Sequence, residues 1–217
     1  MSQGSALPFE QCMQAVSGAM HTLNTQSEDP TEAYKQCIGA AQVLRHVLVD
    51  VFPKWTHRQQ STQVLPDARE PYVYGLYCYA RGHAYAHIFA KQEQSASPLL
   101  LSQVAYNAAH CKFVAAQLLG SSEACEEAHG HAADMMHVQA AHQYNAYTQP
   151  GATSGIGAAC ALEQSAIDHA NLAHASTHKY QQAYQTYMTC NSAGACEPLE
   201  LCRNHIPKFK LTNLRSK

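Results

Sequence analysis

Apolar residues recur at every third or fourth position over most of the chain, which is the spacing that places them on one face of an α-helix. Alternation of apolar and polar residues, the pattern of a half-buried β-strand, is almost absent. The pattern therefore predicts helices separated by short connections. The six expected ranges are 8–24, 31–52, 68–94, 98–119, 122–147 and 154–188.

Breaker and capping residues mark several of these boundaries. Asp29-Pro30 marks the start of the second helix. Gly120 marks the end of the fourth helix, and the two serines that follow it mark the start of the fifth. Helices joined by short connections pack as antiparallel hairpins. We therefore expect an all-α fold of stacked helix hairpins, either a bundle or a short α-solenoid like those of tetratricopeptide proteins.

The helical pattern predicts a single all-helical domain over residues 1–190. From residue 191 the chain changes character, because Gly and Pro interrupt it and Lys and Arg become frequent. We expect residues 191–217 to form an extended basic tail that packs on the domain or trails from it.

The composition argues against a nucleic-acid-binding, membrane-spanning or secreted protein. Charged residues make up 14% of the chain and the formal net charge is −2, so no strong positive field would attract nucleic acid. No run of apolar residues is long enough for a transmembrane helix, and the first residues do not resemble a signal peptide. The nine cysteines are odd in number and lack paired spacing. These features indicate a cytoplasmic protein with free thiols.

Two histidines are the main candidates for metal binding. His83 and His87 are four residues apart on a predicted helix, so both rings can face one point, as metal ligands do. Nearby Tyr79 and Tyr85 allow the alternative of a packed, hydrogen-bonded face rich in Tyr and His. We expect the looser histidine sets to lie on solvated faces. These sets are His129, His131 and His137, and His169, His174 and His178.

Catalytic motifs do not appear in the sequence. We find no Ser-His-Asp order, no nucleophile elbow and no phosphate-binding loop. We therefore expect neither an enzyme nor a bound cofactor.

Several helical segments together resemble a known family. They are AYKQCIGAAQVLRHV (33–47), YVYGLYCYARGHAYAHIFAK (72–91) and LLLSQVAYNAAHCKFVAAQLL (99–119), followed by a last helical hairpin and the segment NHIPKFKLTNL (204–214). In order and spacing they are similar to the C-terminal, helical portion of the BRO domain, the boomerang-shaped domain of Alix- and Brox-type scaffolds that work with the ESCRT machinery. The resemblance does not extend to the N-terminal portion of that domain.

The resemblance implies a non-enzymatic protein-interaction scaffold in endosomal sorting. Its expected partner is the C-terminal amphipathic helix of an ESCRT-III-type subunit, bound in a groove. The docking surface would lie largely on the helix of residues 31–52, where Val47, Val51 and Phe52 could make the contacts. The protein could then associate peripherally with endosomes through its partners.

Two alternatives remain open at the level of sequence. The chain could be an unrelated helix-pair module of the tetratricopeptide-like kind that binds another amphipathic peptide. It could also be a His-rich helical protein that binds metal.

Overall fold

A computed structural model describes residues 9–52, 69–93, 95–148 and 155–192 of the chain. Within these ranges all the regular structure is helical and no strand occurs, which confirms the all-α prediction. The elements are α1 (Phe9–Asn24), α2 (Pro30–His46), the π-helix η1 (Val47–Val51), α4 (Arg69–Gln92), α5 (Pro98–Leu119), α6 (Ser122–Tyr147), α7 (Gly157–Leu172) and α8 (His178–Ser192).

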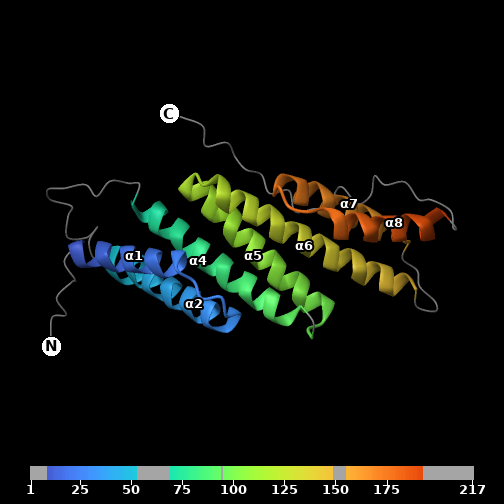
Figure 1. The fold of residues 1–217 in the computed structure, drawn as a ribbon. Helices are drawn as coiled ribbons and strands as arrows, with labels where there is room; N and C mark the ends of the chain where they lie inside the picture. Colours follow the sequence, from blue (N-terminus) through green and yellow to red (C-terminus); the bar gives the residue numbers. More distant parts are fainter. Residues whose placement is uncertain (1–8, 53–68, 94, 149–154, 193–217) are drawn as a thin grey trace.

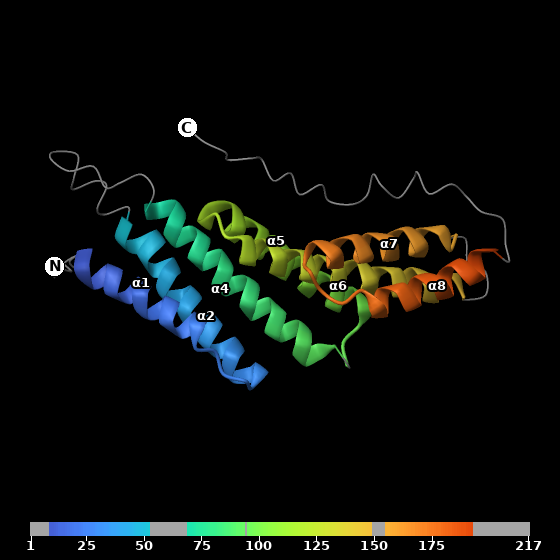
Figure 2. The same cartoon turned by 45° about the horizontal axis from the view of Figure 1, so that its top comes forward.

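The helices are stacked in the order of the sequence (Figure 1). Helix α2 packs against α4, α5 lies between α4 and α6, and α6 packs against α7. The stack extends from α1 and α2 at one end to α7 and α8 at the other, as a second view also shows (Figure 2). This is the predicted stacked helical bundle. The expected tail falls outside the described residues from residue 193 onward, whereas residues 191 and 192 belong to α8.

Alanine lines most of the contacts between the central helices. Its small side chain lets helix backbones approach closely, and dense packing then supplies many weak attractions. The alanines concerned are almost inaccessible to solvent: Ala80 and Ala84 on α4, Ala108, Ala109 and Ala115 on α5, Ala124, Ala128, Ala132 and Ala133 on α6, and Ala166 and Ala170 on α7.

The boundary signals in the sequence act as caps. Asp29 accepts a hydrogen bond from the N–H of Thr31 at 2.8 Å and satisfies a free donor at the start of α2. Ser97 and Ser121 cap α5 and α6 in the same way. Gly120 ends α5 in the left-handed region, with φ of 63°, where a residue without Cβ is least strained.

Helices α7 and α8 replace the single helix that the pattern predicted over 154–188, so that prediction is wrong. His174 adopts a positive φ of 50°, and the N–H of Ala175 bonds back to the carbonyl of Ala170 at 2.9 Å. This is the Schellman arrangement that closes a helix, usually built with Gly or Asn at the left-handed position. Because His stands there, the usual sequence signal for a helix end was absent.

The end of α2 widens into a π-helix. Over Val47–Val51 the turn is looser than in an α-helix, and the N–H of Phe52 bonds to the carbonyl of Val47, five residues back. Single π-helical turns are rare and occur frequently at functional sites. The surface beside η1 is therefore a candidate functional surface.

A glycine on α4 makes room for a buried lysine of α5. A Cβ atom at Gly82 would lie 2.8 Å from Cγ of Lys112 and 3.0 Å from its Cε. Lys112 is fully buried, so its chain has little freedom to move aside. The missing side chain at Gly82 is therefore a packing requirement of the α4–α5 contact.

Replacing Gly82 tests this requirement. Gly82→Ala should lower the free energy of unfolding by about 1–3 kcal/mol, because the steric conflict with Lys112 outweighs the higher helix propensity of Ala. Gly39→Ala is the matched control on α2, where a Cβ meets no atom within 4 Å. It should raise stability by about 0.5–1 kcal/mol. Urea unfolding of both variants measures the difference, and equal effects would contradict the packing argument.

Candidate functional site

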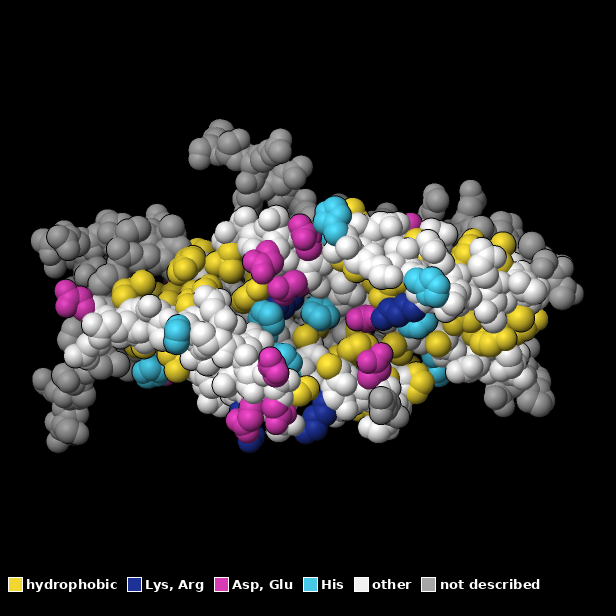
Figure 3. Space-filling view, viewed as in Figure 1, with side chains coloured by type: hydrophobic (Ala, Val, Ile, Leu, Met, Phe, Trp, Pro, Cys, Tyr) yellow, Lys and Arg dark blue, Asp and Glu magenta, His cyan; other side chains and the backbone are white. Residues whose placement is uncertain are grey.

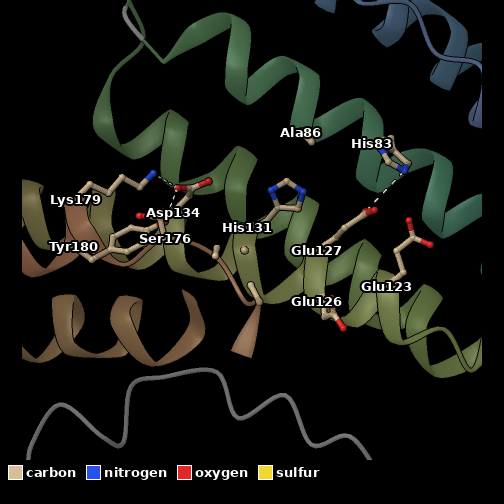
Figure 4. Close-up of a pocket in the computed structure, with 13 residues that line it drawn as sticks. His83, Ala86, Glu123, Glu126, Glu127, His131, Asp134, Ser176, Lys179 and Tyr180 are labelled. Carbon is tan, nitrogen blue, oxygen red and sulfur yellow. Dashed lines mark hydrogen bonds and ion pairs between the residues drawn. The ribbon is translucent and has the colours of Figure 1, made fainter. Parts of the chain in front are cut away.

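The middle of one face of the molecule carries a polar cleft. Acidic, His and Lys side chains gather there in the space-filling view (Figure 3). The cleft has a volume of about 670 Å³ and lies between α4, α6 and the start of α8. We use "polar cleft" for the space bordered by His83 on α4, by Glu127, His131 and Asp134 on α6, and by Lys179 and Tyr180 on α8 (Figure 4).

A buried ion pair lies behind this cleft. The ammonium group of Lys112 on α5 pairs with Oε2 of Glu127 on α6. Tyr79 on α4 donates a hydrogen bond to Oε1 of the same carboxylate at 3.2 Å, and its ring centroid lies 4.0 Å from Nζ of Lys112. Side chains from α4, α5 and α6 thus meet at the carboxylate of Glu127. Both of its oxygens have a hydrogen-bonding partner there.

Burial shifts the pKa values of these groups. It lowers the pKa of Lys112 to about 8, in opposition to the attraction of Glu127. Burial alone would raise the pKa of Glu127, but Lys112 outweighs it and the pKa lies below its usual value. Burial and the charge of Lys112 lower the pKa of His83 to about 3. At neutral pH the cluster therefore holds an ion pair beside an uncharged imidazole.

The second charged contact in the cleft is also internal. Lys179 donates to Oδ1 of Asp134 at 2.7 Å, and the hydroxyl of Tyr180 donates to the same oxygen at 3.0 Å. The close-up shows Asp134 with Lys179 and Tyr180 on one side of the His131 ring, and Glu127 with His83 on the other side (Figure 4). The carboxylates of Glu127 and Asp134 are thus already engaged, which favours a structural role for the polar cleft.

His83 and His87, the candidate metal ligands, make other contacts. The ring of His83 packs edge-on against Tyr79, with centroids 4.5 Å apart. Nε2 of His87 lies 2.9 Å from Oε1 of Gln26 on the chain connection after α1. The part of the chain that the structure describes contains no group of three or more His, Cys, Asp or Glu side chains arranged to hold a metal ion. The two histidines therefore have no third ligand among those residues.

Other histidines, expected on solvated faces, join α6 to α7. Nδ1 of His129 lies 2.9 Å from Nδ1 of His169, and Nδ1 of His137 lies 2.8 Å from Oε1 of the fully buried Glu163. This corrects the expectation for His129, His137 and His169. Sequence spacing could not reveal these pairs, because the partners lie on separate helices.

A second concave region lies at the end of the stack where α4 begins. We call it the apolar groove, and its volume is about 660 Å³. Figure 3 shows hydrophobic side chains gathered at this end of the molecule. The groove is bordered by Arg45, Leu48 and Val49 from α2 and η1, Glu70, Pro71, Tyr74 and Tyr77 from α4, and Leu118 from α5.

Apolar side chains are unusually exposed beside this groove. Val49 is 58% exposed and Tyr74 is 46% exposed. Tyr74 also stacks on Tyr77, with ring centroids 6.2 Å apart and an angle of 18° between the planes. Exposed apolar surface that is concave and rimmed by charge is typical of a protein-binding site.

The three residues predicted to form the docking surface lie elsewhere. Val47, Val51 and Phe52 are 2%, 7% and 4% exposed, and Val47 and Phe52 pack in the core formed by α1, α2 and α4. This corrects their assignment as contact residues, because a partner cannot reach side chains that the fold itself has buried. The neighbouring Val49 and Leu48 face the groove instead. The signal that could have found Val49 is an apolar residue on the polar side of an amphipathic helix.

Comparison of the chain with models of protein families, with curated proteins and with solved structures finds no match. Among the described residues, no helix combines the length and apolar character needed to span a membrane. The class of protein that the fold defines is therefore an all-helical bundle with an exposed apolar groove.

The Lys112–Glu127 pair can be tested by removing either partner. Glu127→Gln leaves a fully buried ammonium without its anion and should lower the free energy of unfolding by about 3–5 kcal/mol. Lys112→Met should cost less, because the Glu127 side chain is 30% exposed and can recover water. A double-mutant cycle measured by urea unfolding should give a coupling energy of about 2 kcal/mol. A coupling near zero would show that the two side chains act independently.

The histidines predict loss of stability in acid. Burial lowers the pKa of His83, His87, His129, His131 and His169. Below about pH 6.5 these histidines therefore bind protons in the unfolded chain but not in the folded chain. The free energy of unfolding decreases as the pH decreases. Each such histidine adds a slope of about 1.4 kcal/mol per pH unit between its two pKa values.

His83→Gln removes one of these groups. The slope of unfolding free energy against pH should decrease by about 1.4 kcal/mol per unit between pH 6 and pH 4, a range above the lowered pKa of His83. Urea unfolding at a series of pH values measures this slope. A variant slope equal to that of the unaltered chain would contradict the burial of an uncharged His83.

Proposed function

We propose that this chain is a non-enzymatic scaffold that binds an amphipathic helix of the ESCRT-III type in endosomal sorting. The observation that carries the proposal is the apolar groove, where Val49 and Tyr74 expose apolar surface between helices that are otherwise well packed. A helix can bury its own apolar stripe in such a groove, as in other helix-in-groove complexes. Recruitment by this partner would bring the chain to endosomal membranes.

The position of the groove supports this proposal. It is bordered by the end of α2 and by η1, which belong to the helix on which the resemblance to the BRO domain puts the docking surface. The contact residues differ from those first expected, since Leu48 and Val49 replace the buried Val47 and Val51. The π-helix at this point is a further feature common at functional sites.

The choice of partner rests on the resemblance and not on the groove alone. An apolar groove of this kind accepts other amphipathic helices as well, so an unrelated helix-binding module is the second candidate function. The exposed Val49 and Tyr74 support this second candidate equally. The polar cleft favours neither an enzyme nor a metal protein, because Glu127 and Asp134 are paired with lysines of the fold.

Titration with a fluorescent peptide tests the proposal. The peptide should cover the C-terminal helix of the host's own ESCRT-III subunit, and binding should be micromolar, about −8 kcal/mol. Val49→Asp puts a charge into the groove and should weaken binding at least tenfold without unfolding the chain, since Val49 is exposed. Fluorescence anisotropy gives the dissociation constant, and circular dichroism checks the fold.

Val43→Asp is the matched control. Val43 is also exposed on α2, at 38%, but it does not border the groove. Binding by this variant should equal that of the unaltered chain. Equal weakening by both variants, or no binding up to millimolar peptide, would refute the ESCRT-III proposal. Equally tight binding of an unrelated amphipathic helix would favour the second candidate.

A further inference from the structure

Two opposite charges border the apolar groove. Arg45 lies in the last turn of α2, and Glu70 lies in the first turn of α4. Both side chains are exposed, and neither forms an ion pair or hydrogen bond with another residue that the structure describes. By contrast, Lys112 behind the polar cleft and Lys179 at its border are both paired. Among the residues that the structure describes, the groove therefore presents one cation and one anion without an ion-pair partner, each from a different helix.

An amphipathic helix in such a groove meets these charges with its flanks. Its apolar stripe faces the groove, and the residues on either side of the stripe face the helices that border it. Coiled coils use the same arrangement, in which charged flanking positions choose the partner and its direction. Opposite charges across the contact attract, and like charges at the same place repel.

From this geometry we infer a rule for the partner, which rests on the proposed function. The helix bound in the apolar groove carries an acidic residue on the flank next to Arg45 and a basic residue on the flank next to Glu70. Turning the helix end for end exchanges its two flanks. The two rim charges therefore select both the charge pattern of the partner and the direction in which it lies.

The size of the effect follows from the exposure of the two residues. Exposed ion pairs contribute little, so each matched pair should strengthen binding by about twofold to fivefold. Replacing an attraction by a repulsion should change affinity by about tenfold. Because the charges are exposed, added salt should reduce the effect.

Designed peptides of one apolar pattern can test the rule on the full chain. In one peptide the flanks are Lys and Glu, in a second both are Lys, and in a third both are Glu. The peptide with mixed flanks should bind most tightly. Glu70→Lys should weaken its binding about tenfold, and the peptide with Glu on both flanks should then bind this variant better than it binds the unaltered chain. Arg45→Glu should show the reverse preference, for the peptide with two Lys flanks.

The outcomes separate this inference from the proposed function. Equal binding of all three peptides, with no effect of Glu70→Lys or Arg45→Glu but with loss in Val49→Asp, would overturn the charge rule and leave the groove as the binding site. Failure of every peptide to bind would overturn both. Glu28→Lys makes the same change of charge at an exposed site outside the groove, and it should leave the order of the three peptides unchanged. If it altered that order, net charge and not the rim would be responsible.

Discussion

The contact between Lys112 and Glu127 is the constraint on which the centre of the fold depends. A buried ammonium group is stable only when an anion and good geometry compensate for the loss of water. Here the anion comes from α6, the aromatic face comes from Tyr79 on α4, and the space comes from the absent side chain of Gly82. A shift of any one of the three helices along its axis would separate these groups. The ion pair therefore fixes the relative position of α4, α5 and α6.

That fixed position also shapes the surfaces available to partners. Alanine brings the central helices close together, and polar side chains between them, such as Lys112 and Glu127, pair with one another. Among the described residues, apolar side chains remain exposed where α2 gives way to η1 and α4 begins, and also at the start of α5 and the end of α7. Tyr74 and Leu118 reach the apolar groove from helices whose register Lys112 helps to hold. A well-packed scaffold with a preformed groove loses little conformational entropy on binding, which suits a helix-binding function.

Local signals explain why much of the fold was predictable. Asp29, Ser97 and Gly120 act within one turn of the residues that they cap, so the sequence alone located those boundaries. The division between α7 and α8 was missed because a histidine, and not a glycine, takes the left-handed position at its turn. Long-range packing explains the remaining errors. Lysine is rarely buried, so nothing in the sequence pointed to Lys112, and an apolar stripe does not say whether it faces the core or a partner.

Hydrogen–deuterium exchange of the full chain with and without the ESCRT-III peptide shows which surface the peptide covers. We expect added protection of amides at the end of α2, in η1 and in the first turns of α4, because the bound helix covers the apolar groove there. The segment of α6 that borders the polar cleft should exchange at the same rate in both samples. Protection in that segment of α6 instead, or no change at η1 and α4 under saturating peptide, would contradict the apolar groove as the binding site.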